Sequence, residues 1–279
     1  MSKVNLVTVT GHHTHTLPHM INHYKDIVDE VYVVVYMQSE NDSILNEVKS
    51  LGIDPFKVVI DDKFNWERVT ELYNEVKLTK PDEWWIVSDD DEFQIYPKPL
   101  HTMIQECEDN GWKFITGGFL DRLGKGGTFP EIKKDSNIWE LFPLGGFFRH
   151  PISDACPNKV CVMKGDIQVT SGQHYATIDD KTVWGIEGTK HEQRYPIEDG
   201  FIQVHHFKWD HTVVQRLKEV SDIKEDYTYW WEYKKMLDFI IDNGYILDIY
   251  THDFNIEKVY NSYNDYSQWE EITNKIIRI

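Results

Sequence analysis

The chain has 279 residues, 41% of them hydrophobic and 27% charged, as in a globular protein large enough to bury a substantial core. Its 29 basic and 47 acidic residues give a net charge of −18, which argues against nucleic acid and against an anionic membrane surface as partners. A nucleotide diphosphate would therefore need a local cation, such as a divalent metal.

The first residues contain no secretory pattern, and no apolar run approaches the roughly 20 residues of a membrane span. Three cysteines (Cys107, Cys156 and Cys161) suit a reducing compartment better than a disulfide framework. The sequence therefore predicts a soluble, cytoplasmic protein without a transmembrane segment.

Strand and helix patterns alternate along the first 120 residues. Short β-branched and apolar runs predict five strands, at 4–10, 31–36, 56–60, 84–88 and 113–118. Apolar residues at helical spacing predict helices between them, beginning near 17, 42, 66 and 100. Repeated strand–helix–strand units predict a parallel, doubly wound sheet with helices on its faces.

Beyond residue 120 the alternation loosens. We expect loops at 123–129 and 144–148, a hairpin at 159–172, a strand at 201–209 and helices from about 211 onward. The fold class is thus α/β, with one compact domain over residues 1–215 and a C-terminal helical extension over residues 216–279 packed on it.

Polar side chains follow every predicted strand. Open parallel sheets bind ligands beyond the carboxyl ends of their strands, so these side chains predict a site at one edge of the sheet. In chain order the strands run into Thr10-Gly11-His12-His13, Gln38-Ser39-Glu40, Asp61-Asp62, Asp89-Asp90-Asp91-Glu92 and Asp121-Arg122.

The acidic run at 89–92 follows WWIV, a predicted central strand, and the chain continues apolar after it. A solvated acidic turn, a divalent-metal site and a general acid/base pair are all compatible with it. Carboxylates held between buried segments need a compensating cation, and Mg²⁺ or Mn²⁺ prefers oxygen ligands of this kind. In an extended turn Asp89 and Asp91 point to the same side and Asp90 points away. The metal site best explains several carboxylates together.

An apolar strand that ends in Asp-x-Asp and continues with Glu-Phe resembles the DxD motif of GT-A glycosyltransferases, particularly a small family 2-like group with a DxDEF signature. Four ordered segments over roughly residues 4–218 carry the resemblance. They are the acidic run, Gly118-Phe119-Leu120-Asp121-Arg122, Lys159-Val160 with Gly172-x-His174, and His205-His206-Phe207-Lys208-Trp209. The resemblance implies a GT-A fold, with a Rossmann-like, mostly parallel sheet.

The resemblance also implies roles for these residues. Asp89 would lie near the ribose and the metal, and Asp91 would ligate an Mn²⁺ or Mg²⁺ ion bridging the donor's diphosphate. A late histidine is a metal ligand in many GT-A enzymes, which makes His205 or His206 the candidate. Neighbouring strand residues point to opposite faces, so at most one of the two binds the ion, and we favour His206.

The loop after the first strand usually holds the base and ribose in this fold. Residues on the nucleotide-sugar side are therefore Thr8, Thr10, His12, Glu40, Asp61, Asp89, Asp90 and Arg122. Five histidines between His12 and His23 depart from the group's usual pattern, and they put these contacts in doubt. His19 and His23, at i and i+4, have a spacing that also suits zinc.

An inverting transfer needs a base for the acceptor hydroxyl, and Asp121 is the favoured candidate among Asp121, Asp154, Glu198 and Asp199. An ion pair of Asp121 with Arg122 is the structural alternative.

The sequence as a whole predicts a metal-dependent glycosyltransferase. Its donor would be a UDP-, GDP- or dTDP-sugar, and its acceptor a glycan, a lipid-linked molecule or a protein. Two alternatives are a metal-dependent nucleotidyltransferase or phosphohydrolase, and a non-catalytic sugar-binding module on a transferase fold.

Overall fold

A computed structural model describes residues 2–11, 14–146, 152–153, 155–156, 158–183, 191–196, 200–223 and 229–247 of the chain. The chain divides into two compact units, residues 1–118 with 158–204 and residues 119–157 with 205–279. No helix among the described residues is long and apolar enough to cross a membrane.

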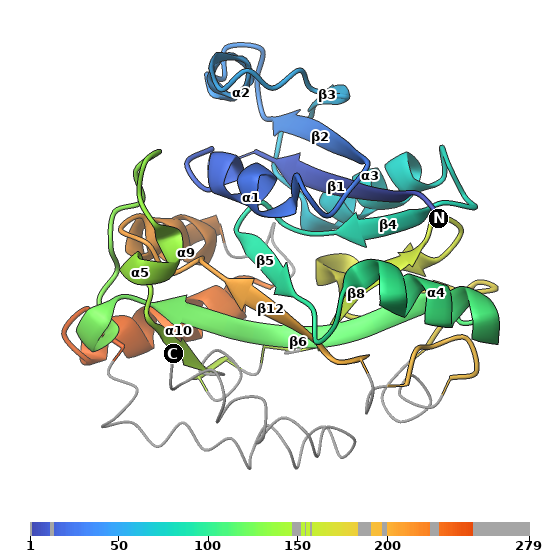
Figure 1. The fold of residues 1–279 in the computed structure, drawn as a ribbon. Coiled ribbons are helices and arrows are strands. Elements are labelled where there is room, and N and C mark those ends of the chain that lie inside the picture. The colour runs from blue at the N-terminus through green and yellow to red at the C-terminus, as the bar shows by residue number, and fades with distance from the viewer. Residues whose placement is uncertain are drawn as a thin grey trace. The chain divides into compact units, whose positions relative to one another are not determined.

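Helices alternate with strands along the first unit, and the predicted α/β fold with a largely parallel sheet flanked by helices is confirmed (Figure 1). The helices of both units are α1 (Leu17–Tyr24), α2 (Ile44–Ser50), α3 (Trp66–Lys77), α4 (Leu100–Asn110), α5 (Ile138–Leu141), α9 (Val213–Ile223) and α10 (Trp230–Asp242). Two 3₁₀ turns are η1 (Lys125–Gly127) and η2 (Ser171–Gln173).

The main sheet has nine strands in the order β3-β2-β1-β4-β8-β6-β12-β5, with β7 paired to β6. The pairs β1–β2, β2–β3 and β1–β4 are parallel, and β8 lies antiparallel to β4 and β6. These strands are β1 (Val4–Thr10), β2 (Glu30–Met37), β3 (Lys57–Ile60), β4 (Trp84–Val87), β5 (Glu92–Ile95), β6 (Phe114–Leu123), β7 (Leu144–Gly146), β8 (Asn158–Lys164) and β12 (Ile202–His206). A smaller sheet joins β9 (Gln168–Val169), β10 (Ala176–Ile178) and β11 (Lys181–Thr182).

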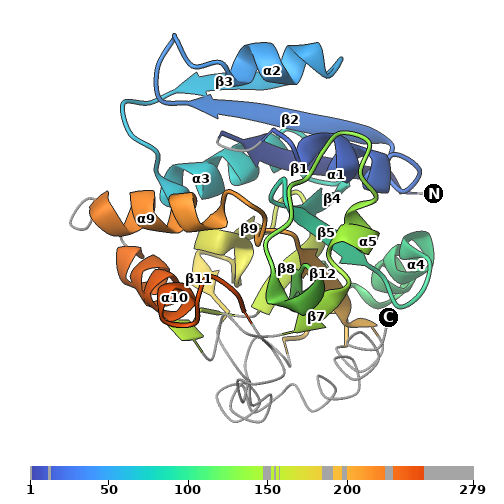
Figure 2. The same cartoon turned by 90° about the vertical axis from the view of Figure 1, so that its left-hand side faces the viewer.

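The core of the first unit lies between α3 and the strands. Val69, Leu72 and Val76 of α3 pack with Val7 and Val9 of β1, and residues of β2, β4 and β8 complete the cluster. Figures 1 and 2 place α3 on one face of these strands and α1 with α4 on the other. Because side chains alternate along a strand, Thr8 and Thr10 point away from the α3 face.

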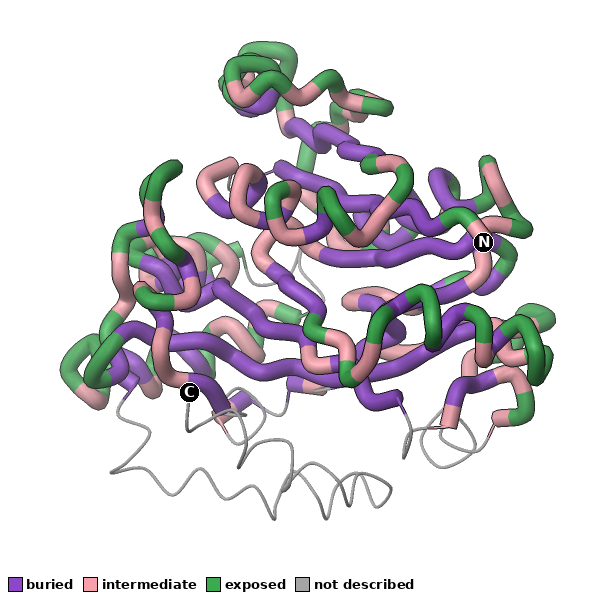
Figure 3. The backbone as a smooth tube through the Cα atoms, in the orientation of Figure 1, coloured by how far each residue is buried: buried purple, intermediate pink, exposed green. Residues whose placement is uncertain are grey.

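The strands that carry the site are buried along their whole length. Every residue of β1, β4 and β6 is buried, as the purple tube of Figure 3 shows. Strands this apolar on both faces match the covered interior of an α/β sheet. They therefore hold the turns at their ends in fixed positions.

Two details of the fold differ from the sequence prediction. A short strand, β5, directly follows the acidic run and was not predicted. Strand β6 runs on to Leu123, so Asp121 and Arg122 lie inside it and not after its end. It can pass close to β12 at Gly117, where a Cβ atom would come within 1.9 Å of the Ile202 carbonyl oxygen.

Two further segments form strands with other partners than expected. The segment predicted as a hairpin at 159–172 forms β8 and β9, but β8 pairs with β4 and β6 while β9 pairs with β10. The segment predicted as a loop at 144–148 contains β7, which pairs antiparallel with the end of β6. Apolar runs of this length signal a strand without naming its partner.

The second unit has its own core, in which α9 and α10 pack together. Its buried residues are Leu123, Trp209, Val213, Leu217, Met236, Leu237, Ile240 and Leu247. The helices predicted from about residue 211 are therefore present as far as the structure describes them. The domain boundary predicted at residue 215 falls inside α9 and stays a prediction.

Candidate functional site

The acidic run forms a tight turn between β4 and β5. The backbone N–H of Glu92 donates to the Asp89 carbonyl at 3.0 Å, which closes the turn. The Ser88 hydroxyl donates to the Glu92 carbonyl at 2.8 Å and ties the last residue before the turn to the first residue after it. The turn is thus fixed by its own backbone and one hydroxyl.

Buried side chains from outside the turn hold β5 in place. The Tyr24 hydroxyl of α1 accepts from the Gln94 backbone N–H at 2.8 Å and donates to the Glu92 carbonyl at 3.3 Å. The Gln94 side chain donates to the Val87 carbonyl of β4 at 3.1 Å. His23 contacts the Gln94 carbonyl through Nε2 at 2.9 Å, and burial lowers the pKa of its imidazole. This contact gives His23 a structural role in the support of β5.

Asp89 is engaged at both carboxylate oxygens. Its Oδ1 accepts from the Tyr73 hydroxyl at 2.8 Å and from the Gln173 amide at 3.2 Å, and its Oδ2 lies 3.6 Å from the Lys159 ammonium. Burial acts to raise the pKa of Asp89, but the Lys159 charge and the two hydrogen bonds outweigh it and leave this pKa below its ordinary value. Asp89 is therefore an ionised carboxylate held by protein groups.

Glu92 forms a buried ion pair with Lys159. Its Oε1 lies 2.8 Å from the ammonium nitrogen, and the two side chains are only 2% and 3% exposed. Lys159 also donates to the Gln173 amide oxygen. The ammonium of Lys159 thus supplies positive charge to two of the four acidic residues.

Asp90 contacts the end of β1, whereas Asp89 contacts Tyr73 of α3. The Oδ2 atom of Asp90 accepts from the Thr10 hydroxyl at 2.6 Å, so this carboxylate ties the turn to the end of β1. Thr8, two residues earlier on the same face of β1, is fully buried. In the part of the chain that the structure describes, its hydroxyl has no hydrogen-bond partner.

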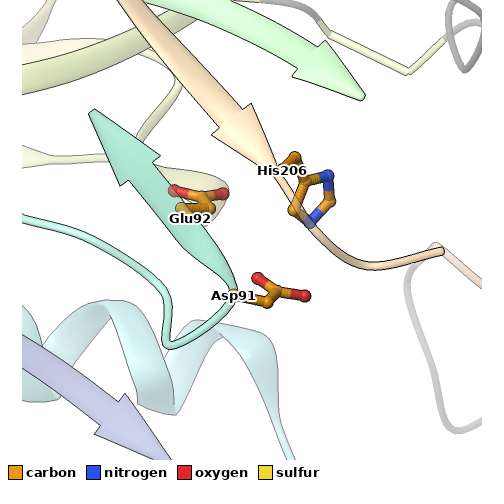
Figure 4. A group of neighbouring side chains, drawn as sticks. All are labelled: Asp91, Glu92 and His206. Atoms are coloured by element: carbon orange, nitrogen blue, oxygen red, sulfur yellow. The ribbon is translucent and has the colours of Figure 1, made fainter. Parts of the chain in front are cut away.

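Asp91 stands at the end of the turn, where the chain enters β5, and is half-buried (Figure 4). One of its carboxylate oxygens lies within 4.8 Å of one from Glu92. Clustered carboxylate oxygens are the ligand type that Mg²⁺ and Mn²⁺ prefer. The residues of the turn therefore fit a divalent ion by their chemistry.

The remaining nucleotide-side candidates lie apart along the sheet ends. Glu40 is exposed after β2, and Asp61 after β3 pairs with Arg68 at 3.8 Å. His12 lies outside the described residues, as do Asp154, Glu198 and Asp199. The roles of all these residues stay predictions.

In the second unit Asp121 is 1% exposed and contacts two ring donors. Its Oδ1 lies 3.1 Å from His206 Nδ1 and accepts from Trp209 Nε1 at 3.1 Å. With the Nδ1–H donating to the carboxylate, the neutral His206 ring carries its lone pair on Nε2. Metal-binding histidines are held by carboxylates in this way. Figure 4 shows His206 at the end of β12.

Arg122 and His205 form a different arrangement. The buried Arg122 guanidinium donates twice to the Phe142 carbonyl, at 2.9 and 2.6 Å, and lies over the Trp139 ring. Its Nη1 contacts His205 Nδ1 at 3.4 Å. Because arginine can only donate, His205 Nδ1 is the acceptor and the proton of its ring lies on Nε2. Burial lowers the pKa of Arg122 to about 10.

These contacts distinguish the two histidines. His205 and His206 are neighbours on the chain, yet their hydrogen bonds to Arg122 and Asp121 fix opposite tautomers. With Nδ1 turned to Asp121, His206 would bind a metal through Nε2. The choice of His206 over His205 as a ligand stays a prediction.

The sequence matches no protein-family model and no curated protein. Three similar solved structures are S. aureus TarS, HddC from Yersinia pseudotuberculosis, and glucosyl-3-phosphoglycerate synthase from Mycobacterium tuberculosis in complex with Mg²⁺ and uridine diphosphate. Their identities to this chain are 11%, 11% and 14%, and their TM-scores are 0.34, 0.30 and 0.27. The matches cover 91%, 44% and 42% of this chain.

This chain spans less than two thirds of each of the three solved proteins, namely 46%, 60% and 44% of their lengths. Likenesses with such low TM-scores carry no argument about this protein. The case for its function rests on its own residues.

Three residues of the acidic cluster were missed as site residues by sequence reasoning. Tyr73 and Gln173 gave no signal, because one sits at a core position of a helix and the other in a loop. Lys159 did give a signal, because it is the charged residue at the start of the apolar run KVCVM. A lysine that begins a buried strand needs an acidic partner, and the acidic run needs a cation.

Proposed function

We propose that this chain is a glycosyltransferase of the GT-A type, which takes its sugar from a nucleotide-sugar donor and requires a divalent ion. The observation that carries the proposal is the acidic turn directly after β4, a buried strand paired in parallel with β1. Ligands of open α/β sheets bind at such strand ends. The DxDEF resemblance supports the same function.

The ligand that the acidic turn supplies to the ion in this proposal is Asp91, and the histidine ligand that the resemblance implies is His206. Asp91 offers a hard oxygen ligand, and His206 offers the Nε2 lone pair that its bond to Asp121 leaves. Mn²⁺ or Mg²⁺ bound there would neutralise negative charge on the donor's departing diphosphate. Asp89, also predicted as a ligand, serves in this proposal to hold the turn, since both its oxygens contact protein groups.

Asp121 orients His206 in this proposal, in place of the general base that the sequence predicts. Its Oδ1 receives both ring donors, and at 1% exposure the side chain is shielded from solvent. Arg122, predicted near the donor, is bound to the Phe142 carbonyl and supports the segment before β7. Thr10 acts through Asp90, which its hydroxyl holds against the end of β1.

A donor screen by thermal shift tests the proposal. The panel is UDP-, GDP- and dTDP-sugars with Mn²⁺ or with EDTA, and nucleoside triphosphates form a second panel. We expect at least one nucleotide-sugar to raise the melting temperature with Mn²⁺ only, and Asp91→Asn to abolish the rise. Asp82→Asn is the control, because Asp82 is an exposed aspartate before the other end of β4.

The screen separates the proposal from its alternatives. Stabilisation by nucleoside triphosphates alone would favour a nucleotidyltransferase. Metal-dependent binding of a nucleotide-sugar with no hydrolysis or transfer on long incubation would favour a binding module. No response to any nucleotide-sugar would contradict the proposal.

A further inference from the structure

Lys159 lies at the centre of a buried network built from four parts of the first unit. Its ammonium contacts Glu92 Oε1 at 2.8 Å and Asp89 Oδ2 at 3.6 Å, and it donates to the amide oxygen of Gln173. Tyr73 donates to the other oxygen of Asp89. The lysine stands on β8, Tyr73 on α3, Gln173 on η2, and the two acids at the ends of the acidic turn.

The groups around Lys159 are acceptors, which suits an ammonium. Lysine has three N–H donors and no acceptor, and the acceptors around Lys159 include two carboxylate oxygens and an amide oxygen. Two carboxylates buried together without a cation would repel each other and lose their hydration. One ammonium against two carboxylates leaves a single net negative charge on the three groups, at a point where the chain enters a buried strand.

Gln173 contacts both the cation and one of the two acids. Its amide oxygen accepts from Lys159 while its amide nitrogen donates to Asp89 at 3.2 Å, so one side chain bridges the cation and the acid. Gln173 is 1% exposed and has a φ of 53°, in the left-handed region that non-glycine residues rarely adopt. The surrounding structure holds it there at a cost of about 1 kcal/mol or more.

We propose that Lys159 is a resident cation of the acidic turn, which holds Asp89 and Glu92 where a metal would otherwise have to. The turn is then formed before any divalent ion arrives, and the ion is confined to the side of Asp91. Lys159 is in this sense a positioning residue for the metal ligand. The confinement to Asp91 rests on the proposed function, whereas the metal-free formation of the turn does not.

The chain offers a matched control in Lys77, a second buried lysine of the same unit. Its ammonium nitrogen donates to the Ile167 carbonyl and lies 3.2 Å from the sulfur of Met163, and neither contact is with a carboxylate. Replacing either lysine by methionine removes a buried ammonium and keeps an unbranched chain. Only Lys159→Met should leave two acids facing each other.

The test measures melting temperature in EDTA and in Mn²⁺ alone, without any nucleotide. We expect Lys77→Met to respond to Mn²⁺ as wild type does. Lys159→Met should melt roughly 10 °C lower than wild type in EDTA. Mn²⁺ should raise its melting temperature more than that of wild type, because the ion then enters between Asp89 and Glu92.

A rescue variant keeps the test decisive if Lys159→Met does not fold. Adding Asp89→Asn and Glu92→Gln to Lys159→Met removes both charges that the lysine balances, and should restore folding and reduce the response to Mn²⁺ to that of wild type. If Lys159 only filled space in the core, its replacement by methionine would lower the stability by the same amount whether or not the two acids are present. Failure of the triple variant to regain stability would therefore overturn the proposal.

A second measurement tests the confinement of the ion to Asp91. Asp89→Asn should weaken Mn²⁺ binding by less than the 10- to 100-fold that loss of a supporting residue costs a metal site, and Asp91→Asn by more. A larger loss for Asp89→Asn than for Asp91→Asn would overturn the assignment. If wild type binds no Mn²⁺ at all, the proposed function fails, and the melting result in EDTA still decides the role of Lys159.

Discussion

Two buried lysines of the first unit show how differently a protein can treat the same charge. Lys77, at the end of α3, is fully buried against a carbonyl and a thioether, and burial lowers its pKa to about 7. Lys159, on β8, is 2% exposed and sits against two carboxylates and an amide oxygen. Burial is the same in both cases, and the partners differ.

The difference shows where the first unit keeps a buried lysine in its charged form. Lys77 contacts neutral groups, so near neutral pH it is held partly as an uncharged amine. Lys159 has anionic partners, and the ionised state of the lysine is the state that they need. A buried lysine with acids around it therefore marks the place where the fold holds an acidic cluster together.

The largest effect should separate these two lysines directly. Lys159→Met should lower the free energy of unfolding by about 3–5 kcal/mol, because it leaves Asp89 and Glu92 buried without their cation. Lys77→Met should not lower it, since the lost bond to the Ile167 carbonyl, worth about 1 kcal/mol, is outweighed near neutral pH by relief from burying an ammonium. Urea unfolding of both variants and wild type measures the two changes. Equal losses would remove the distinction between the lysines.

The pH dependence of stability should sharpen the contrast from the side of Lys77. Its pKa is about 7 in the folded protein, against an ordinary value of 10.5. Between these values the unfolded chain binds more protons, so Lys77 makes stability rise with pH by at most about 1.4 kcal/mol per unit. Below pH 7 the full penalty of the buried charge is present. Lys77→Met should remove this rise, as urea unfolding across that pH range would show, and an unchanged slope would contradict it.

A smaller effect concerns a carboxylate held by neutral donors. Asp121 contacts an imidazole and an indole where Asp89 and Glu92 contact an ammonium. Asp121→Asn should weaken Mn²⁺ binding by about 10- to 100-fold, because an amide is a weaker acceptor than a carboxylate and can also turn its NH₂ toward His206 Nδ1, which favours the other tautomer. Calorimetry gives the affinity, and ¹⁵N chemical shifts of the imidazole give the tautomer.

His205→Gln is the control for that experiment, because its ring is held by Arg122 and not by a carboxylate. It should leave Mn²⁺ affinity near that of wild type. If His205→Gln weakens binding as much as Asp121→Asn does, the assignment of His206 as the ligand is wrong.

The smallest effect sets the scale for ordinary local interactions near the site. Asn65 caps α3, the helix that carries Tyr73 and Lys77, by accepting from the Glu67 backbone N–H at 2.7 Å. Asn65→Ala should lower the free energy of unfolding by about 1 kcal/mol, and Asn65→Asp should retain most of the cap. Neither should alter the response to Mn²⁺. A loss as large as that of Lys159→Met would show that any change near α3 disturbs the acidic turn.

Much of the fold could be predicted because its signals are local. The apolar runs at β1, β2 and β4 and the capped, periodic helix α3 lie where the sequence indicates. Strand β5 was not predicted, because its four residues are too few to show the alternation of apolar and polar residues that marks a strand. The pairing of β8 with β4 and β6 escaped because strand partners are set by tertiary packing.

The site divides along the same line. The acidic run was recognised in the sequence, and its charge indicated that a cation is needed. The sequence could not predict that Lys159 supplies this positive charge, because Lys159 and Glu92 are brought together only by the order of strands in the sheet. The contact of Asp90 with Thr10 was not predicted either, because it depends on the pairing of β4 with β1.

One measurement tests the central claim most directly: Mn²⁺ binding followed by electron paramagnetic resonance, with UDP, GDP and dTDP added in turn. We predict that wild type binds Mn²⁺ together with at least one of these diphosphates, and that Asp91→Asn loses this binding while Asp82→Asn keeps it. Mn²⁺ binding that is indifferent to Asp91, or absent with all three diphosphates, would contradict the claim that the acidic turn is the metal site of a nucleotide-sugar transferase.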